Sequence, residues 1–432
     1  MSERSSETGE VKHDPLAILR QPNFDLYLSS RVLSGIGTTM LQAVFLWHVH
    51  ELSSSAVSLG LLGLMRFFPA LALSLVGGAV ADAYNRRTVI LIAQTVPLTA
   101  AVVVSTATLS GWVSLELIYA VAFAVGLAQA FEGPSNTALL PALVSREEFP
   151  HAVNVSSTSR SLGAVTGPFL GGLLIAVFDV GEAYIAYGIV IALSMTLMFF
   201  LRYQQPTDGP KRAVSIAAIK EGISFVRSRP VIVGSMTLDL FAVIFAGATA
   251  LLPIYAKEIL HAGPVGYGLL LGSYEAGAFV MAFTMVMRPP VVKAGRTLIW
   301  SVVAFGLCTI IFGFSRWLPL SIVAYFMIGA TDQVSVVMRN AIIQLSTPDG
   351  LRGRVSAVSS VFIQSSNQLG AVESGFLAAA TSATFAVVSG GAVAIGVAGA
   401  VALRIRELYG YAIDRSQPAK AEEPSKPAAV TS

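Results

Sequence analysis

Charged residues are scarce in this sequence. Asp, Glu, Lys and Arg make up 12% of its 432 residues, whereas apolar residues make up 54% and the mean hydropathy is +0.70. A soluble globular domain carries about 25% charged residues, which cover its water-facing surface. With about half that share, this chain cannot cover such a surface. We therefore predict an integral membrane protein whose main partner is the lipid bilayer.

Cysteine is nearly absent as well. The single cysteine, Cys308, lies in an apolar run, so a disulfide framework and a CxxC metal site are both excluded. The sequence has no GxxxxGKS or GxxxxGKT phosphate-binding loop, which excludes ATP as the energy source, and no set of nucleophile, base or metal ligands stands out. The net charge is only +3, without a basic stripe. We expect no enzyme activity, no metal, no cofactor and no nucleic acid.

Long apolar stretches fill most of the chain. A helix needs about 20 apolar residues to cross roughly 30 Å of hydrocarbon. Twelve stretches meet this need: residues 28–50, 56–81, 88–110, 114–131, 152–178, 182–202, 231–259, 265–287, 297–314, 318–339, 356–380 and 384–403. The sequence therefore predicts an all-α integral membrane fold with twelve transmembrane helices.

Lysine and arginine are distributed unevenly among the loops. The loops after the second, fourth, sixth, eighth and tenth stretches hold fourteen of them, whereas the opposite loops hold only Lys257 and Arg316. Cytoplasmic loops retain basic residues. Both termini are therefore predicted to lie in the cytoplasm.

The longest loop divides the twelve stretches into six and six. It contains AVSIAAIKEGISFVRSR, in which apolar residues recur at helical spacing with basic residues between them. This pattern predicts an amphipathic linker helix on the membrane surface. The expected domains are a cytoplasmic tail (1–27), a six-helix bundle (28–202), the linker (203–230), a second six-helix bundle (231–405) and a cytoplasmic tail whose composition predicts disorder (406–432).

The two halves resemble one another in sequence. LLGLMRFFPA (61–70) aligns with LLGSYEAGAF (270–279), and SLGAV (161–165) aligns with QLGAV (368–372), at offsets of 209 and 207 residues. Parallel repeats of this kind occur in transporters whose halves are related by a pseudo-twofold axis along the membrane normal. We therefore expect two six-helix bundles related by such an axis.

The repeat places Glu275 at the position that Arg66 occupies in the first half. Both are charged residues inside apolar runs, and an intramembrane charge almost always faces protein or water. Equivalent positions of the two halves face each other across the central cavity, so the two charges could neutralise each other or compete for a substrate. The alternative is that each belongs to a polar network within its own half.

Four acidic residues inside apolar stretches are candidates for proton coupling: Asp239, Glu275, Asp332 and Glu373. Loss of hydration disfavours the charged form of a carboxyl group, so protonation near neutral pH is plausible for each. Asp239 and Glu275 lie nearest the centres of their stretches and are the first candidates. Asp332 could instead pair with Arg339, which lies seven residues further along the same predicted helix.

The loop after the second stretch carries a charge pattern. GGAVADAYNRR places Asp82 at the end of a helix beside Arg86 and Arg87, and Gly77 and Gly78 permit close approach of a neighbouring helix. The pattern resembles the signature loop GxxxDxxxRR of the major facilitator superfamily, here Gly78, Asp82, Arg86 and Arg87. The resemblance implies a conformational latch that holds the two halves together on the cytoplasmic side.

The fifth stretch contains LGAVTGPFLGG, with small residues on one helix face. Gly163, Gly167 and Gly171 recur every four residues, which lets a neighbouring helix approach, and Pro168 kinks or stiffens the backbone. The segment, which ends at Gly172, resembles the GxxxGPxxGG motif that marks antiporters of the same superfamily. Helix packing alone is the other explanation.

Three further segments resemble bacterial exporters of the enterobactin-exporter and macrolide-efflux type: FEGPSNTALLPALV (131–144), IKEGISFVRSRPVI (219–232) and residues 330–375. The resemblance covers about residues 15–405. It implies a twelve-span inner-membrane exporter that uses the proton gradient to expel siderophores, macrolides or other amphipathic compounds. One departure is Ala122, which stands where many proton-coupled drug antiporters carry the arginine of LxxRxxxG.

A secondary transporter is the class of function that these features favour. We expect a monomeric, proton-coupled exporter of amphipathic small molecules in the bacterial cytoplasmic membrane. An importer or symporter of a small metabolite on the same fold is the alternative, and a sensor without transport activity is a third hypothesis. Many ligands are compatible with an aromatic and aliphatic cavity wall, so the sequence does not identify the substrate.

Overall fold

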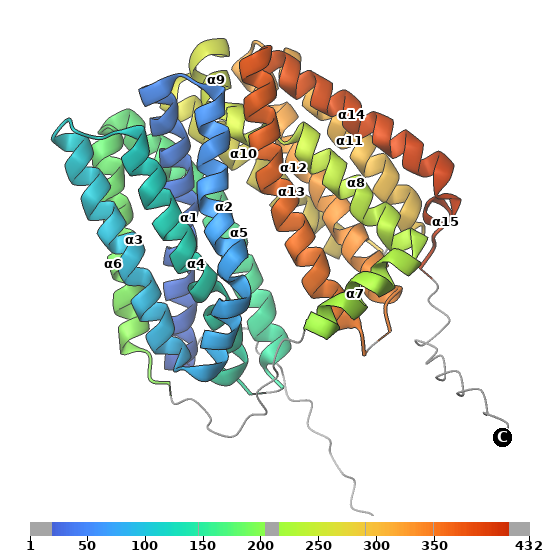
Figure 1. The fold of residues 1–432 in the computed structure, drawn as a ribbon, viewed down its shortest axis with the longest axis horizontal. Coiled ribbons are helices and arrows are strands. Elements are labelled where there is room, and N and C mark those ends of the chain that lie inside the picture. The colour runs from blue at the N-terminus through green and yellow to red at the C-terminus, as the bar shows by residue number, and fades with distance from the viewer. Residues whose placement is uncertain (1–19, 146, 204–215, 290, 349, 414–432) are drawn as a thin grey trace, which may run out of the picture.

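The computed structural model describes residues 20–145, 147–203, 216–289, 291–348 and 350–413, and this part of the chain is all-helical (Figure 1). The first half begins with Gln21, whose side-chain amide donates to the Glu148 carboxylate at 2.8 Å and ties the start of the first helix to the start of the fifth. Hydrogen bonds from Ser145 and Gln21 hold the pKa of the exposed Glu148 carboxyl below its usual value.

Six long helices form the first half. They are α1 (Pro22–Ser53), α2 (Ala56–Ala83), α3 (Arg86–Leu109), α4 (Leu115–Leu143), α5 (Phe149–Val177) and α6 (Val180–Phe200). Helix α1 packs on α5 and α6, α2 packs on α4, and α3 packs on α4 and α6. Asn85 and Ser114 accept hydrogen bonds from the backbone N–H groups of Thr88 and Leu117 and so cap α3 and α4.

Six more long helices form the second half. They are α8 (Pro230–Ala246), α10 (Gly263–Met287), α11 (Ala294–Phe314), α12 (Leu318–Leu345), α13 (Arg352–Ala380) and α14 (Ala383–Arg404). Helix α8 packs on α13 and α14, α10 packs on α12, and α11 packs on α12 and α14. Each half thus has its own set of neighbouring helices.

Ten helices of the described residues are long and apolar enough to cross a membrane. Helix α2 has a shorter apolar segment, Ala56–Pro69, and α13 is not among the ten. Helix α13 is rich in polar residues, including the run Gln364 to Gln368, whereas α2 carries Arg66 within a mainly apolar sequence. These two helices also line the cavity described below.

Several helices extend beyond the expected stretches; α1, for example, begins at Pro22 and α12 ends at Leu345. The fourth stretch was expected to end at residue 131, but α4 continues through Pro134 and Pro141 to Leu143. This continuation carries Glu132, whose carboxylate accepts hydrogen bonds from side chains of α1 and α3. These contacts with other helices stabilise an acidic residue that interrupts the apolar run. The seventh stretch was expected to be one helix over 231–259.

The seventh stretch instead breaks at Gly247. Helix α8 ends at Ala246, and a 3₁₀ turn (Ala248–Leu251), the short α9 (Leu252–Ile254) and a π-turn (Tyr255–Ile259) follow. Gly247 has φ −76° and ψ 86°, outside the helical region, and its carbonyl accepts a hydrogen bond from the Ser374 hydroxyl of α13. The freed backbone is thereby satisfied inside the protein, as a break at membrane depth requires.

The expectation of disorder from residue 406 onward is wrong for residues 406–413. This segment forms α15 (Arg406–Tyr409) and packs at the starts of α8 and α11, with Leu408 fully buried. Backbone hydrogen bonds join Tyr411 to Gly295 and Ile413 to Val292. Composition missed this contact because four large apolar or aromatic residues lie just before the polar tail. Residues 414–432 lie outside the described part.

The predicted linker helix is present as α7 (Ile216–Ser228), which contacts α8 and α13. The Glu221 carboxylate forms an ion pair with Arg354 near the start of α13, and Gly222 lies against the backbone of the same residue. The part of the linker over residues 204–215 lies outside the described residues. Helix α7 is thus fixed to the second half.

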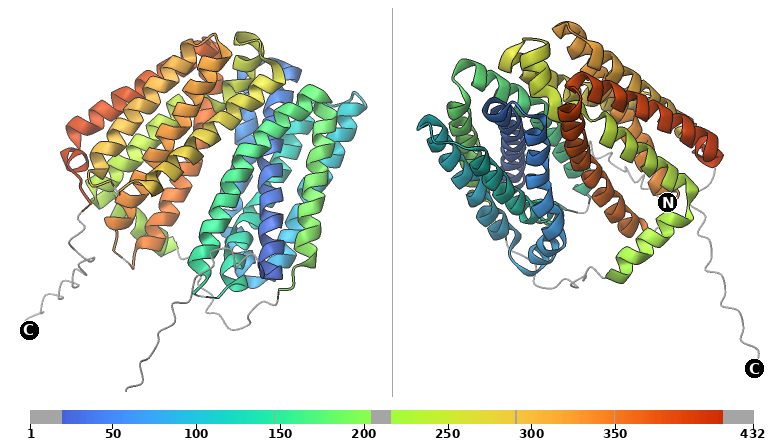
Figure 2. Two further views of the ribbon diagram at one scale, coloured as in Figure 1. Left: turned by 180° about the vertical axis from the view of Figure 1, so that it is seen from behind. Right: turned by 45° about the horizontal axis from the view of Figure 1, so that its top comes forward.

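The two halves meet near one end of the helices. We call the end at which α1 begins the N-terminal face, and the end at which α1 stops, beside α9, the opposite face; they lie at the bottom and top of Figure 1. Across the halves, α2 contacts α13, α5 contacts α10, and α1 contacts α9 and α10. Figure 1 shows the two groups of helices diverging toward the N-terminal face, and the rear view in Figure 2 shows α5 beside α10.

Glycines permit the close contacts between the halves. An added Cβ at Gly172 of α5 would lie 2.6 Å from the Pro264 carbonyl and 2.7 Å from the Gly268 Cα of α10. At the other contact, a Cβ at Gly375 of α13 would lie 2.6 Å from the Ala56 carbonyl of α2. Both contacts lie toward the opposite face, since α10 and α2 begin there.

Candidate functional site

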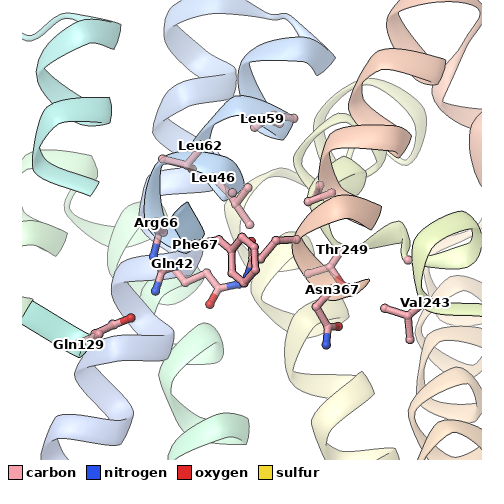
Figure 3. Close-up of a pocket in the computed structure, with 15 residues that line it drawn as sticks. Gln42, Leu46, Leu59, Leu62, Arg66, Phe67, Gln129, Val243, Thr249 and Asn367 are labelled. Carbon is pink, nitrogen blue, oxygen red and sulfur yellow. The ribbon is translucent and has the colours of Figure 1, made fainter. Parts of the chain in front are cut away.

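A cavity of about 410 Å³ lies between the two halves (Figure 3). We call it the Arg66 cavity. Helices α1, α2 and α4 line it from the first half, and α8, the turn after Gly247 and α13 line it from the second half. Its residues are Gln42, Leu46, Leu59, Leu62, Gly63, Arg66, Phe67, Gln129, Val243, Gly247, Thr249, Ala250, Asn367, Gln368 and Ala371. Aliphatic side chains and carboxamides therefore alternate around a single charged residue.

Two smaller cavities adjoin it, one lined by both halves and one lined by the second half. The Glu275 cavity, of about 360 Å³, is lined by Glu275 and Asp332 and shares Gln42 and Asn367 with the Arg66 cavity. The Asp239 cavity, of about 140 Å³, is lined by Asp239 and shares Asp332 with the Glu275 cavity. Arg66, Asp239, Glu275 and Asp332 thus line three adjoining cavities.

Arg66 and Glu275 line adjoining cavities from opposite halves but form no ion pair with each other in the described part of the chain. Glu275 lies in α10, one residue after Tyr274, whose hydroxyl donates to the Asp332 carboxylate at 2.7 Å. In this conformation Arg66 and Glu275 therefore do not neutralise each other directly. Competition of the two charges for a common substrate stays a prediction.

The suggested pairing of Asp332 with Arg339 is wrong in this structure. Arg339 of α12 forms an ion pair with Asp239 of α8, and the two side chains are only 2% and 5% exposed. Asp332 accepts the Tyr274 hydroxyl instead. Spacing along one helix suggested the wrong partner because α8 lies against α12 and brings a second carboxylate to the guanidinium.

Glu373 lies apart from these cavities. It is half-buried in α13, where its carboxylate accepts a hydrogen bond from the neighbouring Ser374 hydroxyl at 3.4 Å. It is not among the residues that line the Arg66, Glu275 or Asp239 cavities. Of the four candidate acids, three therefore gather between the halves and Glu373 does not.

The described hydrogen bonds of Arg86 and Arg87, two residues of the expected latch, lie within the first half. Arg86 donates to the Ala138 carbonyl of α4 at 2.8 Å, and Arg87 donates to the Met198 carbonyl of α6 at 3.1 Å. The side chain of Asp82 lies outside the described residues. The described contacts of the two arginines thus leave the second half free to separate at the N-terminal face.

The two glycines before the latch differ in their surroundings. A Cβ at Gly77 would lie 1.9 Å from the Ala130 carbonyl, so α2 and α4 require a glycine there. A Cβ at Gly78 would have no neighbour within 4 Å. The expectation of close helix approach is confirmed at Gly77 and wrong at Gly78 in this conformation.

We predict that Asp82→Asn leaves the protein folded but slows turnover. The substitution removes the negative charge beside Arg86 and Arg87 without changing side-chain volume, so a latch that holds the halves together would weaken. Transport rates of well-expressed, purified protein would measure the effect. The matched control is Asp25→Asn, which changes an exposed acid on the same face. Normal turnover of Asp82→Asn would contradict the prediction.

The glycine face of α5 packs against α1, as the sequence predicts. A Cβ at Gly163 would lie 3.2 Å from the Gly35 carbonyl carbon, one at Gly167 would lie 2.5 Å from the Ile36 carbonyl oxygen, and one at Gly171 would lie 3.3 Å from Met40. The Thr39 hydroxyl also donates to the Gly163 carbonyl at 3.0 Å. Gly172 points to the second half, and Pro168 lines the Glu275 cavity. Helix packing thus accounts for the glycine spacing.

A polar network in the first half was missed by sequence reasoning. The Glu132 carboxylate of α4 accepts hydrogen bonds from Ser34 of α1 at 3.1 Å, from Gln94 of α3 at 3.1 Å and from Asn136 at 3.4 Å. Its only signal in the sequence was an acidic residue in FEGPSN, directly after the apolar run that was taken as the whole span. The network joins three helices of the first half through one carboxylate.

The opposite face is closed by polar and aromatic contacts between the halves. His50 of α1 lies 3.2 Å from the Glu258 carboxylate, and Lys257 lies over the Trp47 ring. The Tyr267 hydroxyl of α10 donates to the Ala43 carbonyl of α1 at 3.1 Å and is buried. These contacts, made by residues after Gly247 and at the start of α10, seal the central region on this side.

Ala122, which stands where the resembling antiporters carry an arginine, is fully buried in α4. One turn further along α4, an added Cβ at Gly126 would lie 2.3 Å from the Arg66 carbonyl oxygen. The positive charge in this region is therefore that of Arg66 on α2, and α4 supplies none at residue 122.

A family model described as transmembrane secretion effector matches residues 13–430. The chain is 26% identical over 397 residues to the multidrug efflux pump Tap of Mycolicibacterium fortuitum, covering 89% of this chain and 96% of the relative. It is 27% identical to the enterobactin exporter EntS of Citrobacter koseri, covering 71% and 73% of the two chains. Among solved structures, a POT family transporter in complex with a thioalcohol-conjugated peptide aligns with TM-score 0.71 at 12% identity, covering 89% of this chain and 96% of that one.

Proposed function

Because the chain belongs to the transmembrane secretion effector family of the major facilitator superfamily, we propose that it exports amphipathic small molecules in exchange for protons by alternating access. Membership of this family makes the protein a membrane transporter and not an enzyme. The names of the relatives, a multidrug efflux pump and enterobactin exporters, support efflux as the direction. Siderophores, macrolides and other drug-like compounds are the proposed substrate class.

The proposed architecture has twelve membrane spans in two six-helix bundles related by a parallel pseudo-twofold axis. Ten helices have the length and composition of spans, and we assign α2 and α13 as the other two because they face the cavity rather than lipid over part of their length. The excess of basic residues in the loops on the N-terminal face supports a cytoplasmic position for that face and both termini. The proposed location is the bacterial inner membrane, and the proposed functional unit is a monomer.

The observation that carries this proposal is the Arg66 cavity itself. Both halves contribute to its wall, and the contacts between the halves described above lie toward the opposite face. A substrate site between two such halves becomes accessible from one side at a time when the halves rock around it. With the N-terminal face in the cytoplasm, this conformation is the one that loads substrate from the cytoplasm.

Proton coupling is assigned to Glu275 and Asp332. Both carboxylates line the Glu275 cavity, and neither has a cationic partner among the described residues. Asp239, a first candidate on sequence, is paired with Arg339, which stabilises its charged form and makes it a poorer proton carrier. Glu275 has no such partner and therefore becomes the leading candidate.

Everted membrane vesicles give the test of both direction and coupling. We expect wild-type everted vesicles to accumulate an exported compound, first identified by drug-sensitivity and siderophore-secretion screens of a deletion strain, when their lumen is acidified. Glu275→Gln should abolish the uptake that depends on the pH gradient, whereas Glu116→Gln, at an exposed acid on the opposite face, should not. Uptake by intact cells instead of everted vesicles would identify an importer. Unchanged gradient-driven uptake in Glu275→Gln would overturn the assignment of the proton site.

A further inference from the structure

Arg66 is a cation in the central region without an anionic partner in the described part of the chain. Its Nε is buried and makes no hydrogen bond, and no carboxylate of the described residues forms an ion pair with its guanidinium. A buried charge that lacks a partner is strongly unfavourable and is retained mainly where it serves a function. An anion that binds beside Arg66 would form the missing ion pair, and this interaction would favour its binding.

The backbone at Arg66 is held in place by α4. The Arg66 carbonyl lies so close to Gly126 that an added Cβ there would be 2.3 Å from its oxygen, and Pro69 lies 2.9 Å from the same point. Helices α2 and α4 are therefore in direct backbone contact at this level, and the Arg66 side chain extends from this contact to the cavity.

The surroundings of Arg66 are suited to an oxyanion on an apolar molecule. Among the described residues, no acidic side chain lines the Arg66 cavity. Gln42 and Gln129 lie on the Arg66 side of the cavity in Figure 3, and the NH₂ group of a carboxamide can donate hydrogen bonds to an anion. Leu46, Leu62 and Phe67 supply apolar surface in the same wall. A guanidinium pairs with a carboxylate through two parallel hydrogen bonds, which adds geometric selectivity to charge.

We propose that Arg66, with Gln42 and Gln129, forms an oxyanion subsite and that the protein prefers amphipathic organic acids over their neutral counterparts. The preference rests on the proposed transport function, since it describes which molecules the central site selects. Glu275 and Asp332 in the adjoining cavity repel an anion when they are charged and thereby direct its negative end to Arg66. The apolar part of the ligand lies against the leucines and Phe67.

Three naphthalene derivatives with similar bodies test the charge preference: 1-naphthaleneacetic acid, its primary amide and 1-naphthylethylamine. Binding is measured with purified protein in lipid nanodiscs, both directly by titration calorimetry and as a ligand-induced rise in Tm. We expect the acid to bind wild type at least about tenfold more tightly than the amide, because a charge-assisted bidentate pair contributes more than a neutral hydrogen bond. In Arg66→Gln the acid and the amide should bind within about twofold of each other.

Two further variants separate a ligand contact from a structural role. Arg66→Lys keeps the charge but cannot form the bidentate pair, so it should retain a weaker preference for the acid. Arg288→Gln removes an exposed arginine at the end of α10, outside the cavity, and should keep the wild-type preference. Equal binding of acid and amide to wild type, failure of the acid to bind wild type, or a preference that persists in Arg66→Gln would each overturn the subsite. Absence of gradient-driven transport with the Arg66-dependent preference intact would instead contradict the proposed function alone.

Discussion

Replacing Arg339 with glutamine is expected to lower the free energy of unfolding by about 3–5 kcal/mol, the range measured when one partner of a buried ion pair is removed. The Asp239 carboxylate would remain buried beside a neutral amide, with one oxygen that already has no hydrogen-bond partner. Helices α8 and α12 meet at this pair, so their packing should loosen and transport should fall with stability. Asp239→Asn should have a comparable effect through the unpaired guanidinium.

Thermal unfolding in detergent measures this effect, and the double variant shows its origin. Asp239→Asn combined with Arg339→Gln removes both charges, so it should be less destabilised than the sum of the single variants, with a coupling of about 1–3 kcal/mol. The matched control is Arg354→Gln, which breaks the half-exposed pair with Glu221 and should cost at most about 1 kcal/mol. Equal losses from the buried and the exposed pair would show that the Asp239–Arg339 pair does not hold α8 to α12.

Gly172→Leu is expected to abolish transport, with a loss of at least about tenfold, while the protein remains in the membrane. The new Cβ would lie 2.6 Å from the Pro264 carbonyl and 2.7 Å from the Gly268 Cα, and both are backbone atoms that cannot rotate away. Helices α5 and α10 must separate to accommodate it. The opposite face would then close poorly, and the conformation described here would lose population to one that is open on that face.

Cross-linking across the opposite face measures this shift. Ser55 of the first half and Ser382 of the second half line one cavity there, and Cys308→Ala provides a background without cysteine. We expect Ser55→Cys and Ser382→Cys to cross-link readily through a short bismaleimide in the background protein and poorly when Gly172→Leu is added. Gly399→Leu is the control, because a Cβ at Gly399 meets no atom within 4 Å. Unchanged cross-linking and transport in Gly172→Leu would show that this contact does not govern closure.

Much of the fold was predictable from hydropathy and spacing. Each expected stretch has a helix in the structure, because the bilayer requires about 20 apolar residues in each span and leaves no alternative to the helix for its backbone. Family membership was likewise visible in local motifs such as the loop at Asp82 to Arg87. The glycine face of α5 was predictable because residues spaced by four lie on one side of a helix.

Partner choice among the charged residues was not predictable in the same way. The sequence suggested that Arg339 pairs with Asp332 on its own helix, whereas the approach of α8 gives it Asp239. Hydropathy alone ends the apolar stretch before an acidic residue such as Glu132. In the structure, side chains of α1 and α3 donate hydrogen bonds to its carboxylate, so the helix continues. Contacts between helices that are distant in sequence decide these pairings, and no spacing rule describes them.

The sequence by itself determined that this protein is an all-helical membrane transporter, since composition excludes a soluble surface and the motifs identify the superfamily. Only the tertiary structure decided which charges remain free in the central region. Among the described residues Arg66 has no ion-pair partner and shares its cavity with carboxamides, whereas Arg339 is neutralised by Asp239. Two arginines that look alike in an apolar run therefore differ in what they can bind, because a neighbouring helix supplies a carboxylate to one and not to the other.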